Sequence, residues 1–318
     1  MHSDAQQAVA SLVERTSIVI LTLNAAEHLR ALLPALAALE HAPQRVLFVD
    51  SASTDETVSL VLGAGYNVQS IQRREFGHGK TRNLAAQLCA DSDYLVYLTQ
   101  DACPQGSDWL AQLLQPFADP QVALAYGRQL PRAGATEAER FAREFNYPAR
   151  AERTTLADIA HAGIKAVFCS NSFAAYRREA LEKVGGFPER LPLGEDMAVA
   201  ARLLKGGYAR VYQPAARAIH SHDYSIVQEL KRYFDIGTLI AMDSELSQAR
   251  LAASGEGMRF VKSEIAAALQ RKQPLAVVPI LLRTAGKYFG YSLGERYRLL
   301  PLGWRRRLSM HSFFWDQP

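Results

Sequence analysis

The chain has 318 residues, of which 48% are hydrophobic and 21% are charged, so it can form a globular protein with a sizeable core. Its net charge of +4 is too small to indicate nucleic acid as a partner. The three cysteines, Cys89, Cys103 and Cys169, lack metal-ligand spacing and favour a reducing, cytoplasmic location. The apolar runs 18–23 and 275–282 are too short for a signal sequence or a membrane span, which needs about 20 residues.

The first part of the chain alternates between predicted strands and helices. A nearly continuous β-branched run at 18–24 predicts a buried strand, and leucines at helical spacing over 26–39 predict a helix. Further strands are predicted at 45–49, 66–71, 94–99 and 122–126. Their alternation with helices is typical of an α/β protein with a doubly wound parallel sheet. Ser53 or Thr54 is expected to cap the helix after the second strand. No GxGxxG motif follows the first strand, which argues against a dinucleotide-binding domain.

The stretch 94–104 is predicted to be a central parallel strand that brings one carboxylate, Asp101, to its C-terminal end, where Pro104 ends it. In open α/β sheets, ligands bind just beyond the carboxyl ends of the strands. A carboxylate at this place can hold a divalent cation against a phosphate group. Alternatively, Asp101 only caps the turn into a helix near Ser107.

The second part of the chain is predicted to be mainly helical. Residues 132–160 have a helical composition, 167–176 are expected to be extended, and a helix is predicted at 197–205. Two short strands follow, at 210–212 and 217–220. The remaining helices are expected to break near Gly255, Pro274, Gly290 and Pro301.

Polar residues gather at the predicted strand ends and in the loops. They are Asn24, Asp50, the loop 78–83, Asp101, and Glu195 and Asp196 with His220 and His222. In a doubly wound sheet the first four of these converge at one edge. Each cluster alone is a weak signal, and their convergence is the argument for a functional site.

Several motifs resemble a known family. Residues 49–55, Val-Asp-Ser-Ala-Ser-Thr-Asp, look like the VDxxSTD signature of family 2 glycosyltransferases of the GT-A fold. Residues 99–101, Thr-Gln-Asp, stand in the place of that family's DxD motif, and 194–196, Gly-Glu-Asp, in the place of its later ED motif. The segments 76–83, 99–102 and 220–225, together with the tail 308–311 and Trp315, look most like bacterial rhamnosyltransferases.

This resemblance implies a GT-A (Rossmann-like) nucleotide-diphospho-sugar transferase fold with a C-terminal helical extension. The catalytic domain would cover 1–225, with a nucleotide-sugar half at about 15–130 and an acceptor half at about 131–225. The region 226–318 would be the helical extension. The implied activity is inverting transfer of a sugar, L-rhamnose from dTDP-L-rhamnose, onto a saccharide acceptor carried on a lipid, in the synthesis of surface polysaccharide such as lipopolysaccharide.

The resemblance also implies roles for single residues. Asp196 would be the general base, and Glu195 would orient the acceptor or only favour the helix dipole. Asp101 would hold Mg²⁺ or Mn²⁺ on the diphosphate, with a further ligand from His222 or His220. Thr99 departs from the motif and suggests weaker metal affinity, because one carboxylate is missing.

The donor would be bound by residues from several loops. They are Thr22, Leu23, Asn24, Asp50, Ser51, His78, Lys80, Arg82, Asn83 and Gln100. Asp50 would accept a hydrogen bond from the base, or only cap its turn. Lys80 or Arg82 would pair with the diphosphate, or the loop would simply be solvated, and Asn83 is expected at a helix start. Asn171 and Tyr224 are the expected acceptor contacts.

The end of the chain combines aromatic and basic residues. The arginines are Arg296, Arg298, Arg305, Arg306 and Arg307, and the aromatic residues are Tyr288, Phe289, Tyr291, Tyr297, Trp304, Phe313, Phe314 and Trp315. This combination suits peripheral contact with anionic lipids on the inner face of the cytoplasmic membrane, or else a packed appendage or a dimer contact.

Two other functions remain open from the sequence. One is a sugar-nucleotide nucleotidyltransferase, although Asn24-Ala25-Ala26-Glu27 replaces the glycine-rich basic loop that such enzymes carry. The other is a non-catalytic protein that binds a nucleotide sugar or a glycan, a possibility that Thr99 favours.

Overall fold

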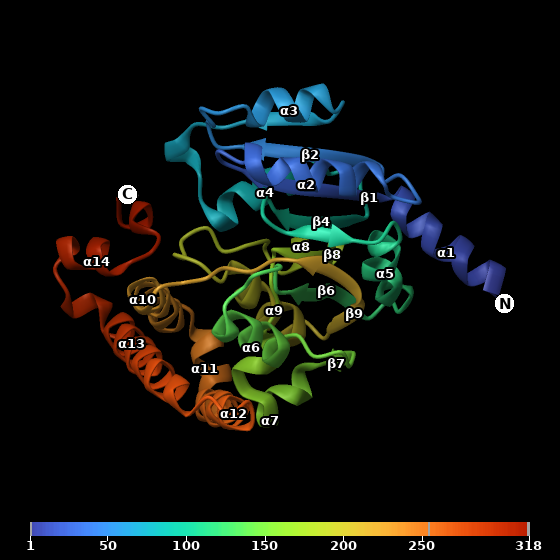
Figure 1. Cartoon of the computed structure of the whole chain (residues 1–318). Coiled ribbons are helices and arrows are strands. Elements are labelled where there is room, and N and C mark those ends of the chain that lie inside the picture. Colours follow the sequence, from blue (N-terminus) through green and yellow to red (C-terminus); the bar gives the residue numbers. More distant parts are fainter. Residues whose placement is uncertain (1, 254, 317–318) are drawn as a thin grey trace.

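The computed structural model describes residues 2–253 and 255–316. One curved sheet lies at the centre with helices on both faces, and the C-terminal helices pack together beside it (Figure 1). The strands are β1 (Thr16–Thr22), β2 (Arg45–Asp50), β3 (Asn67–Ser70), β4 (Tyr94–Thr99), β5 (Cys103–Gln105), β6 (Val122–Leu130), β7 (Glu152–Thr154), β8 (Phe173–Arg177) and β9 (Ala209–Ile219).

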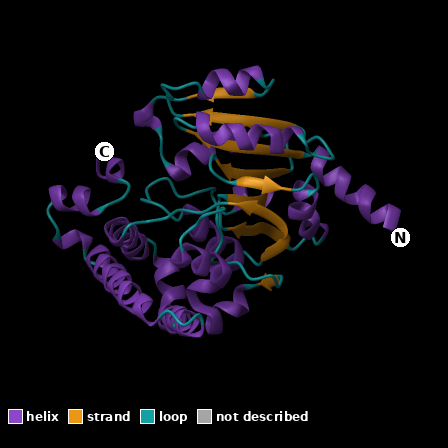
Figure 2. Ribbon diagram, viewed as in Figure 1, coloured by secondary structure: helices purple, strands orange, loops and turns teal. Residues whose placement is uncertain are grey.

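The helices surround this sheet, as the purple ribbons of Figure 2 show. They are α1 (His2–Glu14), α2 (Ala26–Ala37), α3 (Thr57–Gly63), α4 (His78–Leu88), α5 (Trp109–Leu114), α6 (Glu137–Asn146), α7 (Ile159–Ala162), α8 (Arg178–Lys183), α9 (Glu195–Lys205), α10 (Ile226–Met242), α11 (Ser244–Ala252), α12 (Glu256–Gln270), α13 (Val277–Glu295) and α14 (Leu302–Leu308).

The sheet is mixed, with the strand order β3-β2-β1-β4-β8-β6-β9-β5 and with β7 paired to β9. The first four strands are parallel, as predicted for a doubly wound sheet. The prediction of a wholly parallel sheet is wrong, because β8 runs antiparallel to both β4 and β6. The chain leaves β6 at the edge where β4 also ends, and after segment 131–172 it enters β8 from that same edge. A strand that starts where its neighbours end must run in the opposite direction.

Both faces of the sheet are buried, which explains why β1 and β4 are apolar without alternation. In β1, Val19 packs into the core under α4, α8 and α9, while Ile18 and Ile20 pack into the core under α2 and α5. Successive side chains of a strand point to opposite faces, so a strand covered on both sides needs apolar residues throughout.

Three local predictions were wrong. Ser53 does not cap α3, because its hydroxyl donates to Asp50 and α3 begins only at Thr57, two residues beyond Asp55. Pro104 does not end β4, which stops at Thr99; it lies in β5 and pairs with β9. The two short strands expected at 210–212 and 217–220 form one strand, β9, with an irregularity between its two ladders.

The C-terminal helices confirm three of the four predicted breaks. Gly255 and Pro301 stand directly before α12 and α14, and Pro274 starts the short turn that precedes α13. Gly290 lies inside α13, where a Cβ atom would come within 2.1 Å of the Leu230 carbonyl oxygen of α10. This glycine therefore allows close helix packing and does not end the helix. Within the described residues, no helix is long and apolar enough to cross a membrane.

Candidate functional site

One edge of the sheet collects most of the predicted site residues. The C-terminal ends of β2, β1 and β4 lie side by side there; Asp50 is the last residue of β2, and Leu23 and Gln100 directly follow β1 and β4. Because β8 is antiparallel, its first residues lie at the same edge, and the Thr99 amide donates to the Ser172 carbonyl at 3.4 Å. The segments 15–130 and 131–225 therefore meet beside β4.

The Asp50 carboxylate organises the turn after β2. It is almost fully buried and accepts from the Thr22 hydroxyl at 3.0 Å, the Ser53 amide at 2.9 Å and the Ser53 hydroxyl at 2.5 Å. Turn capping, the alternative considered from the sequence, is thus present. A carboxylate has about four lone-pair sites, so one acceptor position remains for a ligand.

Amide side chains hold the end of β1 to the ends of its two neighbours, β4 and β2. Gln100 accepts from the Leu23 amide at 2.8 Å and donates to the Leu23 carbonyl at 3.2 Å. Asn24 has a positive φ of 48° and its side-chain oxygen accepts from the Thr54 amide at 2.9 Å. Ser51 differs, because its Oγ is buried without a hydrogen-bond partner among the described residues. An unpartnered buried hydroxyl is unusual and suits contact with a ligand.

A carboxylate and two imidazoles converge just beyond β4. The carboxylate of Asp101 lies 3.4 Å from His220 Nε2 and 3.3 Å from His222 Nε2, and the two Nε2 atoms are 3.1 Å apart. One ligand atom from each residue lies within 4.8 Å of the others, which is a possible metal site. The sequence left open whether His220 or His222 is the ligand, and here both face Asp101.

Gln129 is a site residue that the sequence analysis missed. Its side-chain oxygen lies 2.8 Å from His220 Nδ1 in the buried end of β6, and this acceptor fixes the orientation of the imidazole whose Nε2 faces Asp101. Metal-bound histidines commonly have such a partner on the other ring nitrogen. No local motif marks Gln129, because only the pairing of β6 with β9 brings it to the histidine.

The electrostatics of this cluster favour a cation. Burial alone would raise the pKa of Asp101, but the hydrogen bond and charge of His220, with the charge of His222, hold it well below its usual range. Burial and the neighbouring His220 lower the pKa of His222 to about 4. At neutral pH Asp101 is therefore ionised and His222 is neutral, and these are the protonation states in which the two residues bind metal.

The second pair of carboxylates begins α9. Asp196 accepts from the Asn171 amide at 2.9 Å and from the Met197 amide at 2.8 Å. Glu195 accepts from the Asn171 side chain at 3.0 Å, and Tyr176 donates to the oxygen of the same amide at 2.7 Å. Asn171, expected to contact the acceptor, braces Glu195 with its side chain and Asp196 with its backbone amide.

Arg82 is buried against Glu195. Its Nη1 lies 2.9 Å from a Glu195 oxygen and donates to the His78 carbonyl at 2.9 Å, and both charged side chains are more than nine-tenths buried. Lys80, the other candidate for the diphosphate, is exposed. The expectation that Asn83 sits at a helix start is wrong. It lies midway along α4 and holds both backbone groups of Phe187.

The pKa values of the neighbouring acids Glu195 and Asp196 are shifted in opposite directions. Burial alone would raise the pKa of Glu195, but Arg82, His78 and Asn171 outweigh it and lower the pKa. Burial and the adjacent Glu195 charge raise the pKa of Asp196 to about 6. Asp196 is thus a carboxylate that can take up a proton near neutral pH.

The remaining predicted residues lie at the rim of this edge. His78, the first residue of α4, contacts His311 from the end of the chain. The Tyr224 ring stacks on His222, with ring centroids 5.3 Å apart.

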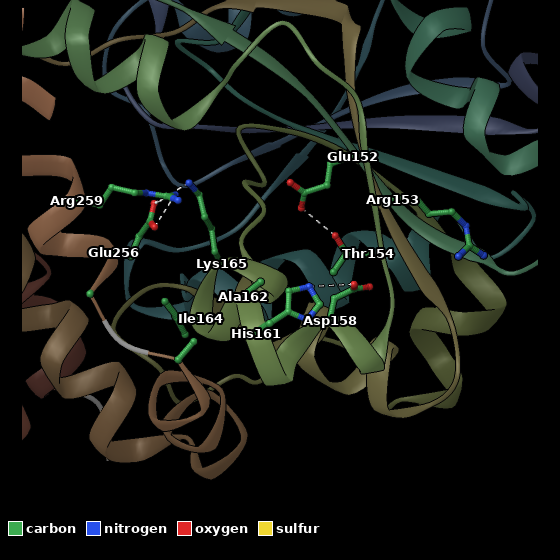
Figure 3. Close-up of a pocket in the computed structure, with 12 residues that line it drawn as sticks. Glu152, Arg153, Thr154, Asp158, His161, Ala162, Ile164, Lys165, Glu256 and Arg259 are labelled. Atoms are coloured by element: carbon green, nitrogen blue, oxygen red, sulfur yellow. Dashed lines mark hydrogen bonds and ion pairs between the residues drawn. The ribbon is translucent and has the colours of Figure 1, made fainter.

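A cavity of about 660 Å³ lies elsewhere (Figure 3). It is lined by residues of β7, α7 and α12, including Glu152, Lys165 and Glu256. β7 pairs with the first residues of β9, whereas His220 follows the last residue, so this cavity and the Asp101 cluster lie at opposite ends of β9. None of the predicted site residues lines it.

Comparison with known proteins decides the family. Residues 17–185 match the family described as Glycosyl transferase family 2. The chain belongs to glycosyltransferase family 2. Family membership makes it a glycosyltransferase and confirms the resemblance found in its motifs.

Two of the similar proteins come from Salmonella. The O-antigen chain rhamnosyltransferase RfbN of Salmonella typhimurium is 40% identical over 303 residues, which cover 95% of this chain and 96% of the relative. The O-antigen chain rhamnosyltransferase WbaN of Salmonella anatum is 42% identical over 274 residues, with 86% and 87% covered.

Solved structures confirm the predicted fold class. The mannosyltransferase PcManGT from Pyrobaculum calidifontis, in complex with GDP-Man and Mn²⁺, has a TM-score of 0.57 at 19% identity and covers 95% of this chain and 86% of its own. Residues 1–349 of S. aureus TarS, in complex with UDP-GlcNAc, have a TM-score of 0.53 at 17% identity, with 90% and 92% covered. This family 2 enzyme thus has the α/β nucleotide-sugar transferase fold with a helical C-terminal region.

The buried ion pair at this edge yields a stability prediction. Glu195→Ala should lower the free energy of unfolding by about 3–5 kcal/mol, because Arg82 would stay buried and charged without its partner. Chemical denaturation measures this. Glu179→Ala is the matched control, since Glu179 pairs with Lys183 on the surface, and it should unfold like the unchanged protein. Equal effects of the two substitutions would show that the buried pair does not stabilise the fold.

Proposed function

We propose that this family 2 enzyme transfers L-rhamnose from dTDP-L-rhamnose, with inversion, onto a lipid-linked saccharide during surface polysaccharide synthesis. The catalytic domain in this proposal is 1–225, and 226–318 are the helical region that contacts the membrane. The observation that carries the proposal is the meeting of Asp101, His220 and His222 with Asp196 at one sheet edge, in a chain 40% identical to an O-antigen rhamnosyltransferase.

The donor set beyond β4 fits a divalent cation. One carboxylate and two imidazole nitrogens are ligands typical of Mn²⁺ and related metals, whereas Mg²⁺ prefers oxygen ligands alone. We therefore favour Mn²⁺, with Asp101, His220 and His222 as ligands. A cation bound there supplies positive charge to the diphosphate as it leaves.

Asp196 is the proposed general base. Its raised pKa, about 6, makes the carboxylate a better proton acceptor than an ordinary aspartate and still leaves it ionised at pH 7. The acceptor hydroxyl oxygen forms a bond to the anomeric carbon, the bond from that carbon to the diphosphate oxygen breaks, and the hydroxyl proton moves to Asp196. The Asn171 and Met197 amides hold the carboxylate in place without using all of its acceptor capacity.

The nucleoside would lie beside the ends of β1 and β2. Asp50 has one acceptor position left for a base N–H, and the unpartnered Ser51 hydroxyl is at the same strand end. Lys80 and Arg82 bring positive charge to the start of α4. The choice of dTDP over other nucleotides rests on the Salmonella relatives and the motifs that resemble rhamnosyltransferases.

Family membership weakens both rivals. The match to glycosyltransferase family 2 argues against a nucleotidyltransferase. A non-catalytic binding protein would need no carboxylate with a raised pKa braced by two backbone amides.

The outward face of α13 is the proposed membrane contact. Exposed apolar side chains begin with Leu275, in the turn before α13, and continue along the helix at helical spacing: Val278, Leu281, Leu282, Tyr288, Phe289 and Leu293. The opposite face, with Gly286, Gly290 and Gly294, packs on α10. Leu299, Leu302 and Trp304 extend the apolar surface into the segment that carries the five arginines. Apolar residues beside arginines match the chemistry of an anionic bilayer surface.

The base assignment predicts loss of catalysis without loss of binding. Asp196→Asn keeps an oxygen for only one of the two amide contacts and cannot accept the proton, so rhamnosyl transfer should fall by about 10²–10⁴-fold while dTDP affinity stays. Transfer is measured with dTDP-rhamnose and the lipid-linked acceptor. In the unchanged enzyme, kcat/KM should fall tenfold per pH unit below about 6, because only the deprotonated Asp196 is active. Full activity of the variant would refute the assignment.

If Asp101 is a metal ligand, its substitution should reduce both Mn²⁺ binding and the rate of sugar transfer. Asp101→Ala should reduce transfer by about a hundredfold or more and abolish Mn²⁺ binding in calorimetry, because the only carboxylate of the cluster is removed. Asp108→Ala, an exposed aspartate in the following turn, is the control and should keep both. An unchanged enzyme that is fully active in excess chelator would contradict the metal role.

If the outward face of α13 contacts a membrane, the protein should sediment together with lipid vesicles, to an extent that depends on the lipid. The unchanged protein should bind vesicles of phosphatidylcholine mixed with phosphatidylglycerol better than vesicles of phosphatidylcholine alone, and less at high salt. Leu282→Glu with Phe289→Glu should abolish this binding. Leu62→Glu, at an equally exposed apolar residue of α3, should not affect it. If the double variant instead converts a dimer to a monomer and leaves vesicle binding unchanged, the face is a dimer contact.

A further inference from the structure

The last segment of the chain returns to the catalytic edge. After α14, residues 309–315, which we call the tail, pass back toward the start of α4, and the C-terminal end lies beside the segment that precedes α4 (Figure 1). From the sequence, this part is expected to resemble rhamnosyltransferases, and its aromatic residues to face a membrane, a packed appendage or a dimer contact. The contacts of the tail assign it another place.

The tail is fixed to α10 by a buried carboxylate. Asp235 is fully buried, and its Oδ2 accepts from the Met310 amide at 2.8 Å and from the His311 amide at 3.2 Å. Trp315 packs against Phe234, the preceding residue of α10, with ring centroids 6.4 Å apart. A buried carboxylate binding two successive amides sets the position of His311 closely.

His311 and Phe313 then meet the start of α4. His311 Nδ1 is 3.4 Å from His78 Nε2, and the two rings are edge to face with centroids 4.9 Å apart. Phe313 packs on Phe76 at 5.6 Å. The contact between Phe313 and Phe76 packs the tail against the protein. The contact between His311 and His78 brings the His311 imidazole to the N-terminus of α4.

The same corner contains several groups suited to an anion. α4 has 11 residues, and no side chain among the described residues caps its N-terminus, so its first amides are available. Arg82 is buried, and its Nε lacks a partner among the described residues although Nη1 pairs with Glu195. Burial and the nearby His78 lower the pKa of His311 to about 3, so its ring is neutral and donates through one nitrogen.

We propose that the tail is a wall of the donor site and that His311 binds the diphosphate of the nucleotide sugar, together with Arg82 and the start of α4. This inference rests on the proposed function, since it takes the donor to be a nucleoside diphosphate sugar bound at this sheet edge. It adds a binding residue from the opposite end of the chain. The Asp235 clamp makes closure of the donor site depend on the C-terminal helices.

Nucleotide binding by the purified full-length chain tests the inference. His311→Ala should raise the dissociation constant for dTDP about tenfold or more, which is the effect of losing one hydrogen bond to a charged group. Thymidine, which has no phosphate, should bind the variant and the unchanged protein alike. Ser312→Ala, at the exposed neighbouring residue, is the matched control and should bind dTDP normally. Equal dTDP affinity of the His311 and Ser312 variants would overturn the assignment.

Hydrogen exchange of the unchanged protein gives a second readout that does not depend on any variant folding. Saturating dTDP should slow exchange of the amides in 309–315, and thymidine should not. If dTDP binds and exchange in the tail is unaltered, this inference fails while the proposed function stands. If the unchanged protein does not bind dTDP at all, the proposed function fails and this inference fails with it.

Discussion

The antiparallel pairing of β4 with β8 is the constraint on which the site depends. Leu98 pairs with Phe173, so the chain entering β8 passes directly beside Asp101 at the end of β4. Asn171, two residues before β8, is then in place to bind both acids at the start of α9. Were β8 parallel, its first residue would lie at the far edge of the sheet, and the acids would be a strand length away from the metal cluster.

Two neighbouring acids differ in chemistry because their surroundings differ. Glu195 has a buried guanidinium beside it and stays ionised, whereas at Asp196 burial and the charge of Glu195 outweigh the amide donors and the more weakly acting Arg82. Pairs of carboxylates whose pKa values are pushed apart are typical of sites that move protons. Arg82 therefore has an electrostatic part in the site even before any ligand binds, because it stabilises the charge that raises the pKa of Asp196.

The sequence was sufficient wherever the signal was local. The strands around 18–24, 45–49 and 94–99 were predicted because burial on both faces requires unbroken apolar runs. Contacts between distant segments were not predictable in this way. No local pattern shows that β8 is antiparallel or that Gln129 faces His220.

The wrong predictions for Gly290 and Ser53 have the same cause, which is that local propensity does not reveal a residue's contacts. Gly290 is a typical helix breaker, but here it allows α13 to approach Leu230 of α10. Ser53 is a typical helix cap, but its hydroxyl binds Asp50. The motif resemblance supplied the family, and hence roles for Asp101 and Asp196 that periodicity alone could not give. The contact of His311 with His78 joins residues 233 positions apart and has no signal in either segment.

The central claim is that segments far apart along the chain form one metal and nucleotide site at a single sheet edge. The most direct measurement is a crystal structure with dTDP and Mn²⁺, with the metal located by its anomalous scattering. The account predicts one Mn²⁺ ion bound by Asp101 and at least one of His220 and His222, with the diphosphate on it and the thymine beside Asp50. Manganese or dTDP bound elsewhere, for example in the cavity beside β7, would contradict it.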